Sequence, residues 1–584
     1  MKKTVYNLSC FFILLFLFLG CDQEKPTPIQ PKTKFDEIND SAYVGGKGFT
    51  GEGWESNNDM PIYAQRNTNK GGTFRISYPF FPSTLRVSGK EADYEVHGVI
   101  RNLVYESLLK LHPNTLEHIP SLASHWQILK DYKTYRFRLN HKAKWADGTQ
   151  VTTKDVIASW EFHLQDDLES PYTQEIFQKF YPPIAESKYI FHITAKELNW
   201  RLFHYFTSTP IYPAHILKNI TAKQYITEYN YQAILSSGPY TMRHSPNQDK
   251  IIFERRLDYW GGNERFNKGL YNFDVIEIII ENDSSKTFER FKKGDFDVHS
   301  VLIAKQWATE MNFEEIKNGK IKKEKIYNQR PQGFSGIALN MRTSPFNDIR
   351  VRKAFTLLFN VEKMNKKHFY NEYQQLDSYF PGSPYENKNN PKYRYNGRAA
   401  VKLLREAGWH RKGKLRYKNN KPLSVTLICE EGLIPLIQAI YQKDLNKAGI
   451  RIDYLPIHIP ENEQQLYNFQ FQMAFISWGG DFFPDPSSSW KSNLADKENS
   501  NNIPGLKHEK IDKICDAYNK MFLQHQREQA MQELDYILME QIPYILGWGG
   551  NFQRILYWDK FSYPEGHLLK TGDVWDIVYL WSMK

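Results

Sequence analysis

The chain has 584 residues and a formal net charge of +10, from 76 lysines and arginines against 66 aspartates and glutamates. This length predicts about three or four compact units, and a composition of 41% hydrophobic and 24% charged residues excludes general disorder and a polytopic membrane protein. The charge does not indicate nucleic-acid binding, because basic and acidic residues are interspersed, as in KTFERFKKGDFD at 286–297.

The first twenty residues have the pattern of a secretory signal. After a short basic start, residues 10–19 form an apolar run of the length of a signal h-region, about half of what a membrane span needs. The run ends at FLGC, which resembles the lipobox of bacterial lipoproteins, although Phe18 stands where leucine is usual. We therefore predict a lipoprotein signal peptide over 1–20 and lipidation at Cys21; the alternative is an ordinary signal peptide.

Residues 21–70 are predicted to form a flexible tether, because they are rich in Gly, Pro, Asn and charge and have no sustained apolar period. After this segment the pattern becomes α/β. Strands are predicted over 71–80, 135–139 and 273–280, and helices over 152–160, 351–364, 398–407 and 509–540. Cys429 and Cys515 remain for folding chemistry, and the sequence leaves open whether they form a disulfide.

Catalytic signatures are absent from the sequence. There is no HExxH, GxSxG, P-loop or CxxC, and the 17 histidines show no metal-ligand spacing. The acidic pairs Asp295/Asp297 and Asp481/Asp485 have the ordinary role of loop capping as their simplest explanation. We predict a protein that is not an enzyme and that has no cofactor and no metal.

A series of ordered blocks covering nearly all of 71–584 resembles the extracellular solute-binding proteins of family 5. The most diagnostic block is YRFRLNHKAKWADGTQVTTKDVIASWEF at 135–162, and the segment 332–380 is most similar to the branch tied to oligopeptide and microcin C uptake. The other blocks are VYESLL (104–109), PSLASHW (120–126), SGPY (237–240), LDYWG (257–261), GDFDV (294–298), NMRTSPFNDIRVR (340–352), LREAGW (404–409) and WGGD (478–481).

The resemblance implies an α/β, type II periplasmic binding protein fold, in which two lobes are joined by a hinge and one lobe carries an extra inserted domain. Lobe 1 is expected to be discontinuous, and the inserted domain belongs to it. The expected boundaries are 71–112, 236–333 and 546–584 for lobe 1, 113–235 for the inserted domain and 334–545 for lobe 2. Glycines at Gln332-Gly333 and at 547–550 lie where the two lobe crossings are expected.

The same resemblance implies the substrate-binding component of an ABC importer. Its partners would be an oligopeptide ligand, the permease and ATPase subunits of the transporter, and a membrane held through the lipid on Cys21, at the extracytoplasmic or periplasmic face of a bacterial cell envelope. A monomer that binds no nucleic acid is expected. Two alternatives stay open: a non-transport interaction lipoprotein, such as an adhesin or signalling receptor, and a binding protein for another solute such as an oligosaccharide.

A receptor for many peptides should hold their shared main chain by strand addition and should pair their charged ends. The strands that match the family lie in one segment of each lobe. They comprise Tyr94, Glu95, Val96 and His97 in lobe 1, and Ser477, Trp478 and Gly479 in lobe 2. Trp478 is predicted to be a pocket wall or, alternatively, a core residue.

The two charged ends of a peptide need partners of opposite sign. Asp481 matches the family position that pairs with the peptide's amino group, and the alternative is that it only caps the loop before Phe482. The partner of the carboxylate end stays unassigned among Arg330, Arg342 and Lys363.

Overall fold

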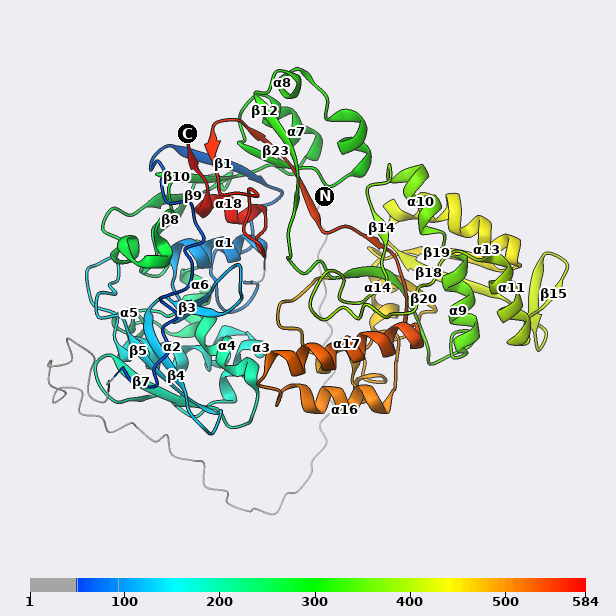
Figure 1. Ribbon diagram of the computed structural model, residues 1–584, viewed down its shortest axis with the longest axis horizontal. Helices are drawn as coiled ribbons and strands as arrows, with labels where there is room; N and C mark the ends of the chain where they lie inside the picture. The colour runs from blue at the N-terminus through cyan, green and yellow to red at the C-terminus, as the bar shows by residue number, and fades with distance from the viewer. Residues whose placement is uncertain (1–48, 50, 93) are drawn as a thin grey trace, which may run out of the picture. The chain divides into compact units, whose positions relative to one another are not determined.

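The computed structural model describes residues 49, 51–92 and 94–584, so the predicted signal peptide and Cys21 lie outside the described residues. The described part of the chain has mixed α and β structure, with several separate sheets (Figure 1). No helix within it is long and apolar enough to cross a membrane.

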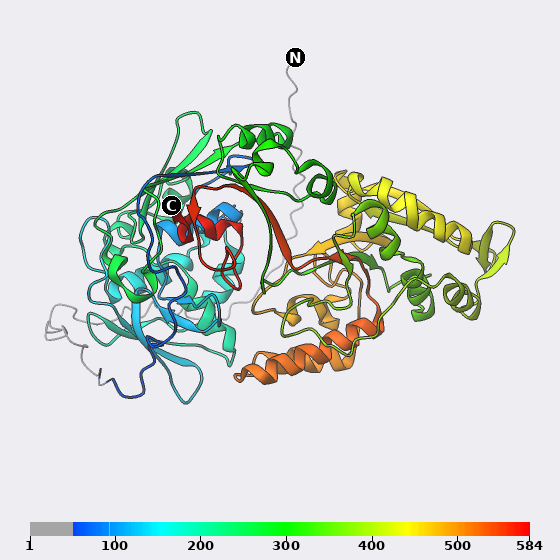
Figure 2. The same cartoon turned by 45° about the horizontal axis from the view of Figure 1, so that its top comes forward.

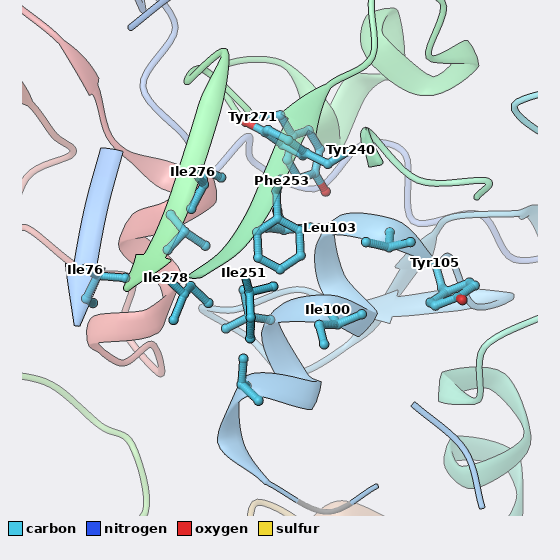
Figure 3. Close-up of a cluster of buried hydrophobic side chains, with 14 of the residues drawn as sticks. Ile76, Ile100, Leu103, Tyr105, Tyr240, Ile251, Phe253, Tyr271, Ile276 and Ile278 are labelled. Atoms are coloured by element: carbon cyan, nitrogen blue, oxygen red, sulfur yellow. The ribbon is translucent and has the colours of Figure 1, made fainter. Parts of the chain in front are cut away.

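The first sheet has the order β1-β10-β9-β8, with β1 parallel to β10 and the other neighbours antiparallel. Its strands are β1 (Thr73–Tyr78), β8 (Tyr240–His244), β9 (Lys250–Arg255) and β10 (Val275–Ile280). Alternate residues of β1, including Phe74 and Ile76, are buried, as the period of a half-buried strand requires. Helix α1 (Glu95–Val104) covers this face, and Figure 3 shows its Ile100 and Leu103 beside Phe253 of β9.

A three-stranded antiparallel sheet of order β11-β23-β12 adds to this body, and the two sheets together are called lobe 1 below. Its strands are β11 (Val298–Ser300), β12 (Ile321–Tyr327) and β23 (Phe552–Trp558). Lobe 1 also contains α7 (Ser284–Lys292), α8 (Glu314–Lys317), α18 (Ile577–Leu580) and the small pair β24 (Phe561–Ser562) and β25 (Ser582–Met583). The central position of β23 brings the C-terminal region of the chain into lobe 1.

The inserted domain has its own antiparallel sheet, β4-β5-β7-β6, and its own apolar core. Thr152 and Asp155 form the capping box at the start of α2, because the Thr152 N–H donates to the Asp155 carboxylate at 2.7 Å. The elements are β4 (Ala123–Ile128), β5 (Thr134–Leu139), β6 (Ile184–Ala185), β7 (Ile190–Thr194), α2 (Thr153–His163), α3 (Pro171–Gln178), α4 (Trp200–Ser208), α5 (Ala214–Leu217) and α6 (Ala222–Glu228), with the hairpin β2 (Leu109–Leu111) and β3 (His118–Pro120) beside them.

A five-stranded mixed sheet, β19-β18-β20-β13-β21, defines lobe 2. Its strands are β13 (Phe334–Leu339), β18 (Ser424–Cys429), β19 (Arg451–Pro456), β20 (Met473–Trp478) and β21 (Tyr544–Leu546). Two apolar clusters lie on its helices, one around α9 (Ile349–Leu358), α11 (Gly397–Glu406) and α13 (Lys443–Ala448), the other around α16 (Glu509–Tyr518) and α17 (Gln524–Gln541). Shorter elements are α10 (Val361–His368), α12 (Ile434–Ile437), α14 (Pro460–Tyr467), α15 (Pro486–Trp490) and the β15 (His410–Lys412), β16 (Leu415–Lys418) and β17 (Lys421–Pro422) sheet.

Two predicted helices are each broken into two. The stretch 351–364 is interrupted between α9 and α10, where the Asn360 side chain accepts from the Lys363 N–H and begins a new helix. The stretch 509–540 is interrupted between α16 and α17, and the turn that joins them reaches the inserted domain. The sequence left open whether Cys429 and Cys515 form a disulfide, and in the structure both cysteines are buried and free.

The prediction of a flexible tether is wrong for residues 51–70, which pack against the folded domain. Glu55 and Trp126 exchange two backbone hydrogen bonds, of 2.8 and 3.0 Å, and Asn57 donates to the His118 carbonyl at 2.8 Å. Ala64 is buried in the lobe 1 core. This segment has no apolar period because single contacts, and not one face of a regular element, hold it against the domain.

Two segments connect the lobes, and Figures 1 and 2 both show them side by side. The first joins β12 to β13 and the second joins β21 to β23, through the short strand β22 (Trp548–Gly549), which pairs with β14 (Gln374–Gln375). The two are tied together where the Gly547 N–H donates to the Ser335 carbonyl at 2.7 Å. The numerical domain boundaries given above stay predictions.

Candidate functional site

Ser477, Trp478 and Gly479 lie at the end of β20, next to the first connecting segment. Gly333, with φ +68°, and Gly480 permit this approach: a Cβ at Gly333 would collide with the carbonyl oxygen of Trp478, and one at Gly480 would collide with Pro331. The segment around Gly333, where a lobe crossing was expected, is therefore in direct backbone contact with the predicted ligand-binding strand around Trp478.

The edge of β20 is partly open. On one side β13 pairs with β20 along its whole length, from Met473 to Trp478. On the other side β18 pairs only with Met473 and Ala474. Ser477 and Gly479 are exposed, and no strand of the described chain covers this side of residues 475–478. An extended ligand could add its main chain at this open edge.

Asp481 is exposed and follows this edge directly. Its Oδ1 accepts the Phe483 N–H at 2.9 Å, so the carboxylate does cap its loop. Its negative charge, however, has no lysine or arginine nitrogen within 4.0 Å among the described residues. A carboxylate with one oxygen in a turn and no counter-charge can still bind an ammonium group.

Trp478 is half-buried and forms a wall. Its indole N–H donates to the Tyr544 hydroxyl at 3.1 Å, which fixes the ring, and Trp478 lines two cavities. Of the four cavities called A to D here, these two are cavity B, of about 400 Å³, and cavity D, of about 800 Å³. Asp481 also lines cavity B, and Ser477 lines cavity D.

The segment Tyr94 to His97 is not a strand, and this prediction is wrong. It forms the N-terminus of α1: Tyr94 is the N-cap, and its N–H donates to Nδ1 of His97 at 3.0 Å. Val96 and His97 are fully buried, because α1 places positions 96, 99, 100 and 103 on one apolar face. Glu95 is exposed and accepts from the Trp575 indole at 3.3 Å. None of these four residues lines a cavity that contains Asp481.

The second wall of the cleft comes from the inserted domain instead. Cavity A, of about 540 Å³, is lined on one side by the inserted domain and on the other by lobe 2, and it shares Pro331 and Ser383 with cavity B. Its aromatic lining is Trp126, Tyr135, Trp200, Phe203, Tyr385, Phe482, Phe483 and Phe522. Cavity C, of about 370 Å³, extends from cavity A toward lobe 1, and both are lined by His118, His204 and Phe482. Together these cavities form the interlobe cleft.

Helix α4 docks on lobe 2 across this cleft. The Trp200 N–H donates to the Asn519 carbonyl at 3.0 Å, in the turn between α16 and α17. Arg201 is 3% exposed and forms an ion pair with Asp485 at 2.9 Å, and its Nη2 donates to the Asn519 side chain at 2.9 Å. Burial is the largest single influence and acts to lower the pKa of Arg201, but the Asp485 carboxylate together with Tyr205 and Tyr518 outweighs it, so the pKa is raised above its usual value. The guanidinium therefore stays charged.

Most of the aromatic residues of α4 and β5 were missed as site residues from the sequence. Their pattern marks them as core residues of the inserted domain, and only contact with lobe 2, far along the chain, turns Trp200 and His204 into cleft walls. The 15% aromatic content was the one signal that pointed toward an aromatic cleft.

The three candidates for the ligand's carboxylate lie in different places. Arg330 lines cavity C and forms an ion pair with Asp573. Arg342 lies inside lobe 2, where it donates to the carbonyls of Ala495 and Ile503, so it is structural. Lys363 lines none of cavities A to D. The described residues contain no group of three His, Cys, Asp or Glu that could hold a metal ion.

Among known proteins, the chain is similar to binding proteins over most of its length. The probable peptide-binding protein YejA of Agrobacterium fabrum is 26% identical over 556 residues, which cover 86% of this chain and 88% of that protein. Two solved structures share the fold. One is the oligopeptide-binding protein AppA from Bacillus subtilis in complex with a nonapeptide, with 20% identity, a TM-score of 0.68 and coverage of 89% of this chain and 100% of that one.

The second is a mannohexaose-bound periplasmic oligopeptide-binding protein from Thermotoga maritima, with 18% identity, a TM-score of 0.65 and coverage of 88% and 99%. The expected two-lobed α/β binding-protein fold is thereby confirmed. The family model described as bacterial extracellular solute-binding proteins, family 5 Middle, matches residues 117–501, well over half of the chain. The chain therefore belongs to the bacterial extracellular solute-binding proteins of family 5.

Proposed function

We propose that the chain is the substrate-binding component of an ABC importer and captures oligopeptides in the interlobe cleft. The observation that carries the proposal is the open edge of β20 at residues 475–478, followed directly by the unpaired Asp481 carboxylate. An extended peptide would add its main chain to this edge and place its amino group on Asp481. The name of the Agrobacterium relative and the nonapeptide in the AppA structure support a peptide.

The cleft chemistry supports a ligand with varied side chains. Cavities A and B are lined by aromatic rings and polar side chains and are large enough to hold water, so they can accept side chains of many shapes. The protein would carry out no chemistry of its own and would pass the peptide to a permease with its ATPase subunits. Lipidation at Cys21 would hold it at the extracytoplasmic face of the envelope.

The proposal is tested by titrating the purified mature protein with a random pentapeptide pool and following its thermal unfolding. Peptides that bind only the folded state should raise the melting temperature with concentration. Absence of stabilisation at millimolar pool concentration would contradict the proposal.

One observation favours an oligosaccharide as a second candidate ligand. Cavity D is lined by two tryptophans, Trp478 and Trp548, and by polar side chains that include the amides of Gln374, Gln375 and Asn551 and charged groups such as Asp377 and Arg394. Flat rings with amide groups suit a sugar, and a structure of the same fold holds mannohexaose. Titration with mannohexaose in the same thermal assay separates the two candidates, because the peptide receptor should not respond to it.

A further inference from the structure

Two histidines meet where cavity A joins cavity C. His118 begins β3 in the hairpin next to the inserted domain, and His204 lies in α4. Their ring centroids are 5.7 Å apart, and both side chains line both cavities. His118 packs on Phe203 and His204 packs on Phe483, so each ring is held edge-on by an apolar neighbour and not by a polar one.

Neither imidazole forms a hydrogen bond or an ion pair with any residue in the described ranges. Nε2 of His118 and Nδ1 of His204 are buried without a partner, and so is the hydroxyl oxygen of Tyr135, which also lines cavity A. Buried polar atoms without a partner are rare in folded proteins because each one costs stability. Three of them around one cavity therefore require an explanation, and a ligand group supplies one.

Both rings are uncharged at neutral pH. Burial and, to a lesser extent, the nearby His204 lower the pKa of His118 to about 3. Burial also lowers the pKa of His204 to about 4, against the opposing effect of the Asp481 carboxylate. Neutral imidazole offers one donor and one acceptor nitrogen, and it offers no charge to pair with a carboxylate.

A metal ion explains the pair less well. Histidines that bind a metal almost always donate their second ring N–H to a carboxylate or a carbonyl, which orients the ring. Neither His118 nor His204 has such a partner among the described residues, and no third His, Cys, Asp or Glu completes a ligand group there.

We propose that His118 and His204 form an uncharged hydrogen-bonding subsite of the cleft, which receives the carboxamide of an asparagine or glutamine side chain in the bound peptide. The carboxamide carries two donors and an acceptor in one planar, neutral head, so a donor nitrogen of one imidazole and an acceptor nitrogen of the other can bind it together. As the rings stand these two nitrogens are buried, so the subsite requires each ring to turn its buried nitrogen toward the cavity. The inference rests on the proposed function and adds a side-chain preference to it.

The test compares pentapeptide pools that are random except at one position, which is fixed as Gln, Glu or Met. Met matches Gln in length without its hydrogen bonds, and Glu matches its shape with a charge. For wild-type protein, the Gln pool should bind about tenfold more tightly than the Met and Glu pools at one of the five positions. In the double variant His118→Phe/His204→Phe this ratio should fall to about one, with the Met pool unaffected.

His163→Phe is the matched control, because His163 is also a buried histidine but lines none of cavities A to D. It should keep the Gln preference. The subsite is overturned if wild type binds all pools without a Gln preference, if the double variant keeps that preference, or if wild type binds Ni²⁺ or Cu²⁺ stoichiometrically and the double variant does not. Binding of no pool by wild type would instead contradict the proposed function itself.

Discussion

At the scale of single residues, Asp481 shows that a structural and a binding role are compatible. One carboxylate oxygen accepts the Phe483 N–H, as the capping alternative predicted, and the charge stays without a lysine or arginine partner in the described chain. An asparagine at this position would keep the acceptor and remove the charge.

Asp481→Asn is therefore expected to weaken binding of the pentapeptide pool at least about tenfold while leaving the melting temperature of the free protein unchanged. Calorimetry and thermal unfolding measure the two effects separately. Glu498→Gln is the control, because Glu498 is an exposed carboxylate of lobe 2 that forms no ion pair with another residue of the described chain. Equal affinities of the Asp481 variant and wild type would remove Asp481 as the amine anchor.

His163 predicts a pH effect on stability. It is 2% exposed, packs against Phe177 at 4.8 Å, and burial lowers its pKa to about 4. The unfolded chain has a histidine pKa of about 6.5, so below that pH the unfolded state binds the proton more readily and the folded state loses stability until about pH 4. His163→Phe should thus gain stability relative to wild type, by roughly 2 kcal/mol, between pH 7 and pH 4.5.

Urea unfolding at pH 7 and pH 4.5 measures the free energy of unfolding of both proteins. Protonation of carboxyl groups changes that free energy equally in the two, so the difference between them reports on His163. A constant difference between variant and wild type across the range would show that His163 is not buried as a neutral group.

At the scale of elements, patterns among neighbouring residues predicted the helix start at Thr152 correctly. The assignment that rested on resemblance to a family, for Tyr94 to His97, was wrong. The capping box of Thr152 and Asp155 lies within four residues and is present as expected. Tyr94 to His97 was assigned to a strand by resemblance, whereas Val96, Val99 and Leu103 have a helical period that buries one face on the first sheet.

The cleft could be predicted only in part, because a contiguous block of sequence is recognisable whereas contacts between distant parts of the chain are not. Ser477 to Asp481 were found because a contiguous block carries them, and they do line cavities B and D. Trp200 and His204 belong to an ordinary amphipathic helix by sequence. Their contacts with Phe483 and Asn519 are set by packing between distant parts of the chain, as in the neighbouring Arg201–Asn519 hydrogen bond, which joins residues 318 positions apart. The sequence has no local signal for such packing.

The first crossing gives a prediction about a single glycine. Gly333→Ala should destabilise the protein by more than about 2 kcal/mol, because it adds both a left-handed backbone penalty and a collision with the Trp478 carbonyl. Gly413→Ala is the matched control, with φ +63° and no atom near the added Cβ, and should cost about 1 kcal/mol. Chemical denaturation compares the two. Equal losses would mean that the close backbone approach at Gly333 does not exist.

At the scale of the whole molecule, the inserted domain and lobe 2 are held together by a buried charge. Arg201 is 3% exposed while the Asp485 side chain is 35% exposed, so solvent screens one partner. Asp485 also accepts the Ser487 N–H at the start of α15, and an asparagine would retain that cap.

Asp485→Asn is expected to cost about 2 kcal/mol, less than a fully buried pair, because it leaves the Arg201 charge without its counter-ion. Adding Arg201→Met should restore part of the loss, since the uncompensated charge is gone. Urea unfolding of wild type, Asp485→Asn, Arg201→Met and the double variant gives a double-mutant cycle, which measures the interaction between the two side chains. Failure of the double variant to recover any stability would show that the packing of Arg201, and not its charge, joins the two parts.

The central claim is that a peptide binds in the interlobe cleft by adding to the open edge of β20. Hydrogen–deuterium exchange with and without a saturating pentapeptide pool tests it most directly, because main-chain pairing protects backbone N–H groups. We expect slowed exchange in residues 475–481 and in α4, with no change in the distant hairpin β15–β16. Peptide binding that leaves the exchange of 475–481 unchanged would contradict the account.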